Sequence, residues 1–142
     1  MDNIIITKIW NDSDIINNKI FQIKLTCQNE YITIKEEIYL DDYLAKKWAE
    51  TIKKALKENK KYDYEVSMKK KMAPGFSMTI YPYDNHGHIT IEMKMEIEDT
   101  TNKEHFACFY ITTEIGKLEK FSNKIEKIIN LEIDDSVSLL EV

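Results

Sequence analysis

Two histidines that flank a glycine, His86-Gly87-His88, come nearest to a chemical site in this sequence. In a β-strand, side chains two positions apart point to the same face, and imidazoles arranged in this way occur in zinc and copper sites. Asp84 is the nearby carboxylate that could add a ligand. A small metal-binding protein or enzyme centred on His86, His88 and Asp84 is therefore one alternative function.

The third histidine, His105, argues against a metal site shared by all three imidazoles. The alternating pattern pairs Thr90–Ile97 with Phe106–Thr112 as a hairpin, and this places His105 roughly 25 Å from His88 at about 3.3 Å per residue. The stretch DNHG at 84–87 supplies the residue types that tight turns between antiparallel strands require. We predict a hairpin turn here, with no metal and no cofactor.

Other catalytic patterns do not fit this sequence. Its three glycines cannot form a phosphate-binding loop or a dinucleotide fingerprint, and no serine lies in a nucleophile elbow. Cys27 and Cys108 each lie in a strand-like apolar run without an activating pattern, so we predict two free, buried thiols. Strand alternation explains Glu36-Glu37, and helix capping explains Asp41-Asp42. The sequence favours a protein that is not an enzyme.

Composition restricts the class of partner and the compartment. All 20 basic residues are lysine, and the formal net charge is -5. Phosphate-binding and base-reading surfaces favour arginine, so we predict no nucleic-acid partner. No apolar run reaches the roughly 20 residues of a membrane helix, and the first residues lack the basic and apolar segments of a signal peptide. We therefore expect a cytoplasmic protein without a membrane partner.

The spacing of apolar residues along the chain predicts the strands and helices that position these residues. Alternation predicts a meander of three strands, Ile4–Trp10, Phe21–Cys27 and Tyr31–Leu40. A period of about 3.6 residues then predicts a helix over 42–59, with Asp41 or Asp42 as its cap.

Alternation returns in the second half of the chain and predicts four more strands. A final helix follows, which Thr112 or Thr113 can cap. Residues 131–142 form either a last edge strand or a loose tail. We predict one α+β domain over residues 1–142, in which a largely antiparallel sheet of six to seven strands carries two helices. The four strands cover 62–68, 76–80, 89–97 and 106–112.

Exposed tyrosines and acidic side chains are the candidate contacts with a protein partner. The tyrosines fall out of phase with the apolar face of their strands, and carboxylates on one polar strand face would attract a basic partner. The candidate partner-binding residues are Tyr31, Tyr39, Tyr81, Tyr83, Glu92, Glu96 and Glu98.

Lysines are concentrated in one part of the chain. The segment 46–71 has ten lysines against four acids, which leaves the rest of the chain with a balance of -11. One interpretation is a solvated helix face, in which lysines complement the carbonyl end of the helix dipole. The other is a polarised surface that steers an oppositely charged partner.

The segment from Gly87 onward combines a Gly-His-Ile hairpin start, a long alternating strand, the aromatic strand FACFYITTE and a helix that reads LEKFSNKIEKII. This order resembles the C-terminal half of bacterial polymorphic-toxin immunity proteins of the wall-associated-protein (WapI) type. The resemblance covers about a third of the chain, and the lysine-rich first helix has no counterpart in it. It implies a cytoplasmic, non-enzymatic inhibitor that occludes the active surface of a cognate toxin domain, and it assigns no role to single residues.

A further alternative is a structural homodimer that forms through an exposed sheet edge.

Overall fold

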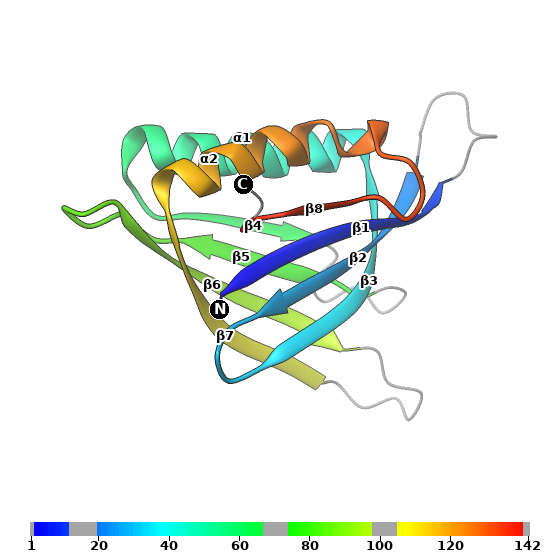
Figure 1. The fold of residues 1–142 in the computed structure, drawn as a ribbon, viewed down its shortest axis with the longest axis horizontal. Helices are drawn as coiled ribbons and strands as arrows, with labels where there is room; N and C mark the ends of the chain where they lie inside the picture. Colours follow the sequence, from blue (N-terminus) through cyan, green and yellow to red (C-terminus); the bar gives the residue numbers. More distant parts are fainter. Residues whose placement is uncertain (1, 12–19, 67–73, 98–104, 141–142) are drawn as a thin grey trace.

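The computed structural model describes residues 2–11, 20–66, 74–97 and 105–140 of the 142-residue chain (Figure 1). The fold is α+β, as predicted. In chain order the elements are β1 (Asn3–Asn11), β2 (Ile20–Gln28), β3 (Thr33–Asp41), α1 (Asp42–Glu58), β4 (Tyr62–Val66), β5 (Phe76–Ile80), β6 (His88–Ile97), β7 (His105–Glu114), α2 (Ile115–Glu126), the short 3-10 helix η1 (Ile128–Asn130) and β8 (Ser136–Ser138).

The strands form two antiparallel sheets of four, in the orders β3-β2-β1-β8 and β4-β5-β6-β7. The sequence predicted a sheet of six to seven strands, so the strand count and the division into two sheets differ from that prediction. Alternation identifies a strand but carries no information about which sheet it joins. The additional strand β8 lies within 131–142, where an edge strand was one of the two expectations, and its three residues pair with β1.

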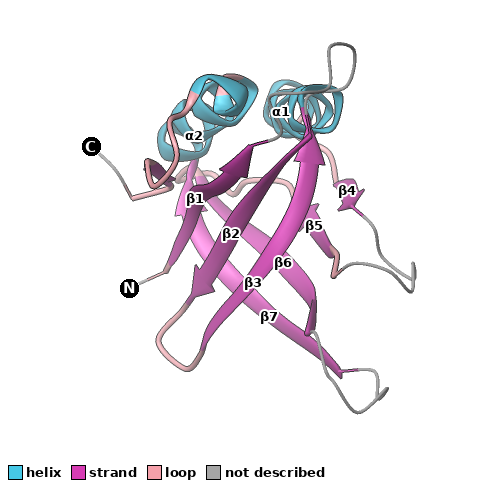
Figure 2. Ribbon diagram, turned by 90° about the vertical axis from the view of Figure 1, so that its right-hand side faces the viewer, coloured by secondary structure: helices cyan, strands magenta, loops and turns pink. Residues whose placement is uncertain are grey.

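The two helices lie side by side over one end of the sheets, and the strands of the first sheet cross those of the second (Figure 2). Inward side chains from both sheets and both helices share one core. Trp48 of α1 connects the helix to the second sheet: its ring stacks on Tyr64 at 5.8 Å between centroids and lies 4.9 Å from the ring of Phe76. The indole N–H donates to the sulfur of Met78 at 3.5 Å.

Helix α1 begins where the sequence predicted. The Asp41 carboxylate accepts the backbone N–H of Leu44 at 2.7 Å and so caps the first turn. The helix ends at Asn59, which adopts the left-handed conformation with φ of 50°. Its buried stripe packs on the sheets and consists of Ala45, Trp48, Ala49, Ile52 and Ala55.

The start of α2 differs from the prediction that Thr112 or Thr113 caps it. Strand β7 continues through both threonines, which pair with Thr90 and Ile89 of β6, and the N-cap is Glu114 without a side-chain hydrogen bond to the helix. The first helical amide, that of Ile115, instead donates to the carbonyl oxygen of Gly87 at 3.1 Å. Pairing with β6 therefore takes precedence over a local cap.

The segment after α2 returns to the first sheet, where β8 pairs with β1 at the sheet edge. Lys8 of β1 lies beneath this segment with only 2% of its surface exposed. Its ammonium group donates to the carbonyl oxygen of Ile129 at 2.9 Å and lies 5.2 Å from the centroid of the Phe21 ring. Burial lowers the pKa of Lys8 because water no longer stabilises the charge.

Candidate functional site

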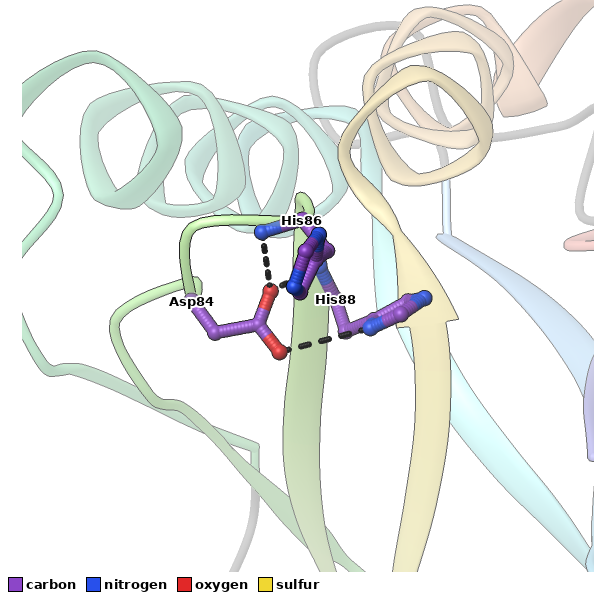
Figure 3. A network of polar contacts seen from close by, with 3 residues as sticks. All are labelled: Asp84, His86 and His88. Carbon is purple, nitrogen blue, oxygen red and sulfur yellow. Dashed lines mark hydrogen bonds and ion pairs between the residues drawn. The ribbon is translucent and has the colours of Figure 1, made fainter.

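His86 and Gly87 lie in the connection between β5 and β6, and His88 is the first residue of β6 (Figure 3). The Asp84 carboxylate accepts the backbone N–H groups of His86 at 2.8 Å and of His88 at 2.9 Å, and its second oxygen lies 3.3 Å from Nδ1 of His88. Gly87 has φ of 77°, which L side chains rarely adopt. These contacts are those of a tight turn, as the sequence predicted.

The hydrogen bonds from His88 and His86 hold the pKa of Asp84 below its usual value, because they stabilise the carboxylate form. The two imidazole rings lie 6.2 Å apart between centroids. The backbone of His105 pairs with Ile97, at the opposite end of the β6–β7 ladder from His88. Within the described residues, no group of three or more His, Cys, Asp or Glu side chains is arranged to hold a metal ion.

A shallow hollow of about 330 Å³ adjoins His88, where β7 meets α2. Asp2, Glu114 and Lys117 line it, so charges of both signs face it. The Asp2 carboxylate already accepts the backbone N–H of Thr112 at 2.7 Å. The hydroxyl of Thr113, also in the wall, is buried and finds no hydrogen-bond partner among the described residues. Among these described residues, no threonine hydroxyl is hydrogen-bonded to the histidine or to a carboxylate that could serve as its base.

The solvent-facing side of the second sheet, hereafter the outer face, presents a different chemistry. Alternate residues of β6 and β7 point away from the core, and the register sets Glu92 opposite Tyr110 and Glu96 opposite Phe106. Phe106 and Tyr110 are 56% and 52% exposed. The outer face consists of Asp63 and Glu65 of β4, Ser77, Thr79 and Tyr81 on and after β5, Glu92, Lys94 and Glu96 of β6, and Phe106, Cys108 and Tyr110 of β7.

Polar contacts across the strands fix several of these side chains. The Tyr110 hydroxyl donates to Oε2 of Glu92 at 2.8 Å, and the nearby carboxylate raises the pKa of Tyr110. The Lys94 ammonium lies 3.6 Å from Oε1 of the same carboxylate. The hydroxyl of Thr79 donates to Asp63 at 2.6 Å. The outer face is therefore a pre-formed arrangement of carboxylates and aromatic rings.

The structure divides the predicted contact residues between the two sheets. Tyr31 is 86% exposed in the turn between β2 and β3, and Tyr39 is 45% exposed on the solvent side of the first sheet, where its ring meets Trp10 edge-on at 6.3 Å. Tyr39 therefore does not share a site with the carboxylates of the outer face. The turn of Tyr31, in contrast, contacts the edge of β7, because the Asn29 side chain accepts the N–H of Tyr31 at 2.8 Å and donates to the carbonyl oxygen of Tyr110 at 3.0 Å.

Tyr81, Glu92 and Glu96 lie on the outer face, but each is only partly exposed. Tyr83 is half-buried against the core, contrary to the expectation that it stands in solvent. Its backbone N–H donates to the side chain of Asn59, which holds this residue close to α1. Glu98 lies outside the described residues.

Sequence reasoning missed Phe106, Cys108 and Tyr110 as surface residues. Cys108 was predicted to be buried beside Phe106 and Phe109, but Cys108 and Phe106 are exposed while Phe109 faces the core. Both cysteines are free, and Cys27 is buried as predicted. Pairing with β6 was the signal that could have identified these positions as outward. Tyr110 and Phe106 lie opposite Glu92 and Glu96, which belong to the polar side of β6.

The helices form a basic layer beside the sheets. Seven lysines and three acids lie in 42–61, and four lysines and two acids in 115–127. The Lys53 ammonium joins the helices through Glu126 at 2.6 Å. The second helix thus extends the lysine cluster that the sequence showed only for the first. Within the described part of the chain, neither helix has the length and hydropathy that crossing a membrane requires.

Comparison with known proteins adds no relative: no protein-family model, no curated protein and no solved structure matches this chain.

Proposed function

We propose that this chain is a non-enzymatic protein-binding module that engages a basic protein through the outer face. The observation that carries the proposal is the exposed pair Phe106 and Tyr110 beside Glu92 and Glu96. Phe106 and Tyr110 flank the exposed Cys108 in one row along β7, and exposed apolar rows of this kind mark interaction surfaces. Carboxylates beside them select partners of positive charge.

The dimensions of the outer face suit a protein partner. β6 and β7 have ten residues each, and β4 and β5 have five each. With a rise of about 3.4 Å per residue and a strand spacing of about 4.8 Å, the projected area is roughly 500 Å². The side chains that stand on it add accessible surface. The outer face is therefore close in size to the roughly 800 Å² that one partner contributes to a standard interface.

A narrower form of the proposal is that the partner is a toxin domain which the chain neutralises by occlusion. This form rests on the resemblance to polymorphic-toxin immunity proteins. A toxin domain that acts on nucleic acid carries a basic surface, and the outer face is complementary to such a surface in charge.

The experiment measures binding of the purified chain to the protein encoded by the neighbouring gene, by calorimetry. Phe106→Ala and Tyr110→Ala should each weaken binding by about tenfold or more, since truncating a central aromatic anchor costs about 2 kcal/mol. Tyr39→Ala is the matched control, because it removes a tyrosine of similar exposure, 45% against 52%, from the solvent side of the first sheet and should leave the affinity unchanged. Equal losses for Tyr39→Ala and Tyr110→Ala would contradict the choice of this surface.

A further inference from the structure

The outer face already holds two ammonium groups that belong to the chain itself. Nζ of Lys94 lies 3.6 Å from Oε1 of Glu92, and Nζ of Lys61 lies 5.5 Å from the centroid of the Tyr81 ring. The first contact is an ion pair and the second a cation–π interaction. Both kinds of interaction that would recognise a partner's cationic side chain are therefore already present on this surface.

Glu92 is fixed more firmly than the lysine that contacts it. Its side chain is 14% exposed and accepts the Tyr110 hydroxyl at 2.8 Å on Oε2, whereas the side chain of Lys94 is 51% exposed. An exposed lysine at 3.6 Å from a carboxylate gains little from the pair and loses side-chain entropy in making it. The carboxylate is thus a pre-organised receptor, and Lys94 is a weakly held occupant.

The same contrast holds at the second position. Tyr81 is half-buried next to β6, where its backbone N–H donates to the carbonyl oxygen of Thr90 at 3.0 Å. Lys61 lies beyond the end of α1 and is exposed. A cation–π contact at an exposed site is weak, so a partner's side chain can displace the lysine at small cost.

We infer that Lys94 and Lys61 are internal placeholders for cationic side chains of the partner. The inference rests on the proposed function and names the group that the outer face recognises: a lysine or, preferably, an arginine on the partner's surface. A guanidinium can donate two parallel hydrogen bonds to Glu92 and lay its planar face on a neighbouring aromatic ring, whereas an ammonium has no planar face to stack. On binding, Lys94 and Lys61 move into solvent and the partner's cations take their positions.

The test replaces each lysine with methionine, which removes the charge and keeps most of the length. The probe is a short arginine-rich peptide that contains phenylalanine, and its glutamate-substituted counterpart reports non-specific binding. Lys94→Met and Lys61→Met should each tighten binding of the arginine peptide by about twofold to fivefold, and the double variant by more, because the peptide no longer displaces an internal cation.

Lys24→Met is the matched control, since it makes the same change in net charge on a half-exposed lysine of β2, in the other sheet. It should tighten binding less than Lys94→Met does. If the wild type binds the peptide and the double variant binds no more tightly than Lys24→Met, the placeholder inference is wrong while the proposed function stands. If neither the wild type nor the double variant binds it, both fail. Thermal unfolding of each variant shows that the fold is retained.

Discussion

The side-chain oxygen of Asn59 accepts the backbone N–H of Tyr83 at 2.8 Å. This bond joins the end of α1 to the connection between β5 and β6. The same connection receives the start of α2, because the carbonyl oxygen of Gly87 accepts the N–H of Ile115 at 3.1 Å. The histidine-containing turn thus ties both helices to the second sheet, which is a structural role for residues whose types suggested chemistry.

Asn59 makes two separable contributions at this junction, and two substitutions distinguish them. Asn59→Gly keeps the left-handed backbone but loses the bond to Tyr83, and should lower the free energy of unfolding by about 1 kcal/mol. Asn59→Ala also strains the backbone, where φ is 50°, and should lower it by about 1 kcal/mol more. Urea unfolding measures both values, and equal losses would refute the separate backbone contribution.

Asp84 should make the free energy of unfolding depend on pH in the acid range. Its pKa is held below the usual 3.8 by the N–H groups of His88 and His86, so the folded protein favours the carboxylate. The stabilisation is fully present above pH 3.8 and is lost as the pH falls through the folded-state pKa. Asp84→Asn keeps an oxygen that accepts the two amides, so it should retain the turn but abolish this part of the pH dependence.

Unfolding by urea at a series of acid pH values measures the effect in the wild type and in Asp84→Asn. Asp84→Ala removes the acceptor as well and should destabilise the protein at neutral pH. If the difference in free energy of unfolding between the wild type and Asp84→Asn stays constant as the pH falls, Asp84 does not titrate as described.

The charged Lys8 should lower the free energy of unfolding at neutral pH and lower it less in alkaline solution. Its pKa is lowered from 10.5 by burial, so between the lowered value and 10.5 the unfolded chain binds more protons than the folded one. The free energy of unfolding therefore rises with pH across that window. Lys8→Met removes the titration, and the rise should disappear.

The neutral-pH stability of Lys8→Met tests a second aspect of the same site. Methionine fills similar volume without a charge to desolvate, although it leaves the carbonyl oxygen of Ile129 without its donor. We expect the variant to be at least as stable as the wild type. A loss of more than about 3 kcal/mol, the cost of breaking a paired buried charge, would show that the ammonium is well compensated.

The two cysteines should differ in their reaction with a maleimide. Cys108 is exposed on β7, whereas Cys27 is fully buried and burial raises its pKa, which suppresses the reactive thiolate. The native protein should therefore incorporate one label per chain rapidly, and Cys108→Ser should incorporate none until it is unfolded. Rapid labelling of native Cys108→Ser would mean that Cys27 is accessible, and Cys27→Ala serves as the complementary control. Labelling of Cys108 should also compete with partner binding if the outer face is the interface.

The sequence by itself determined the features that depend on local physics. The helical period over 42–58, the cap at Asp41 and the turn at 84–87 were predictable because each depends on residues within a few positions of one another. The inward face of β6 was equally clear, since its apolar and polar residues alternate without exception from His88 to Glu96.

Tertiary structure alone decided which side of β7 faces water. Phe106, Cys108 and Tyr110 are residue types that occur in cores, as Ala107, Phe109 and Ile111 are, so the local pattern fits either orientation, and only pairing with β6 selects one. Tertiary packing also separated Tyr39 from Glu92 and brought the turn of Tyr31 against the edge of β7, because the assignment of strands to two sheets depends on contacts between distant segments. The candidate site depends on which strands share a sheet. The sequence does not show this, because a strand has the same period of two residues in either sheet.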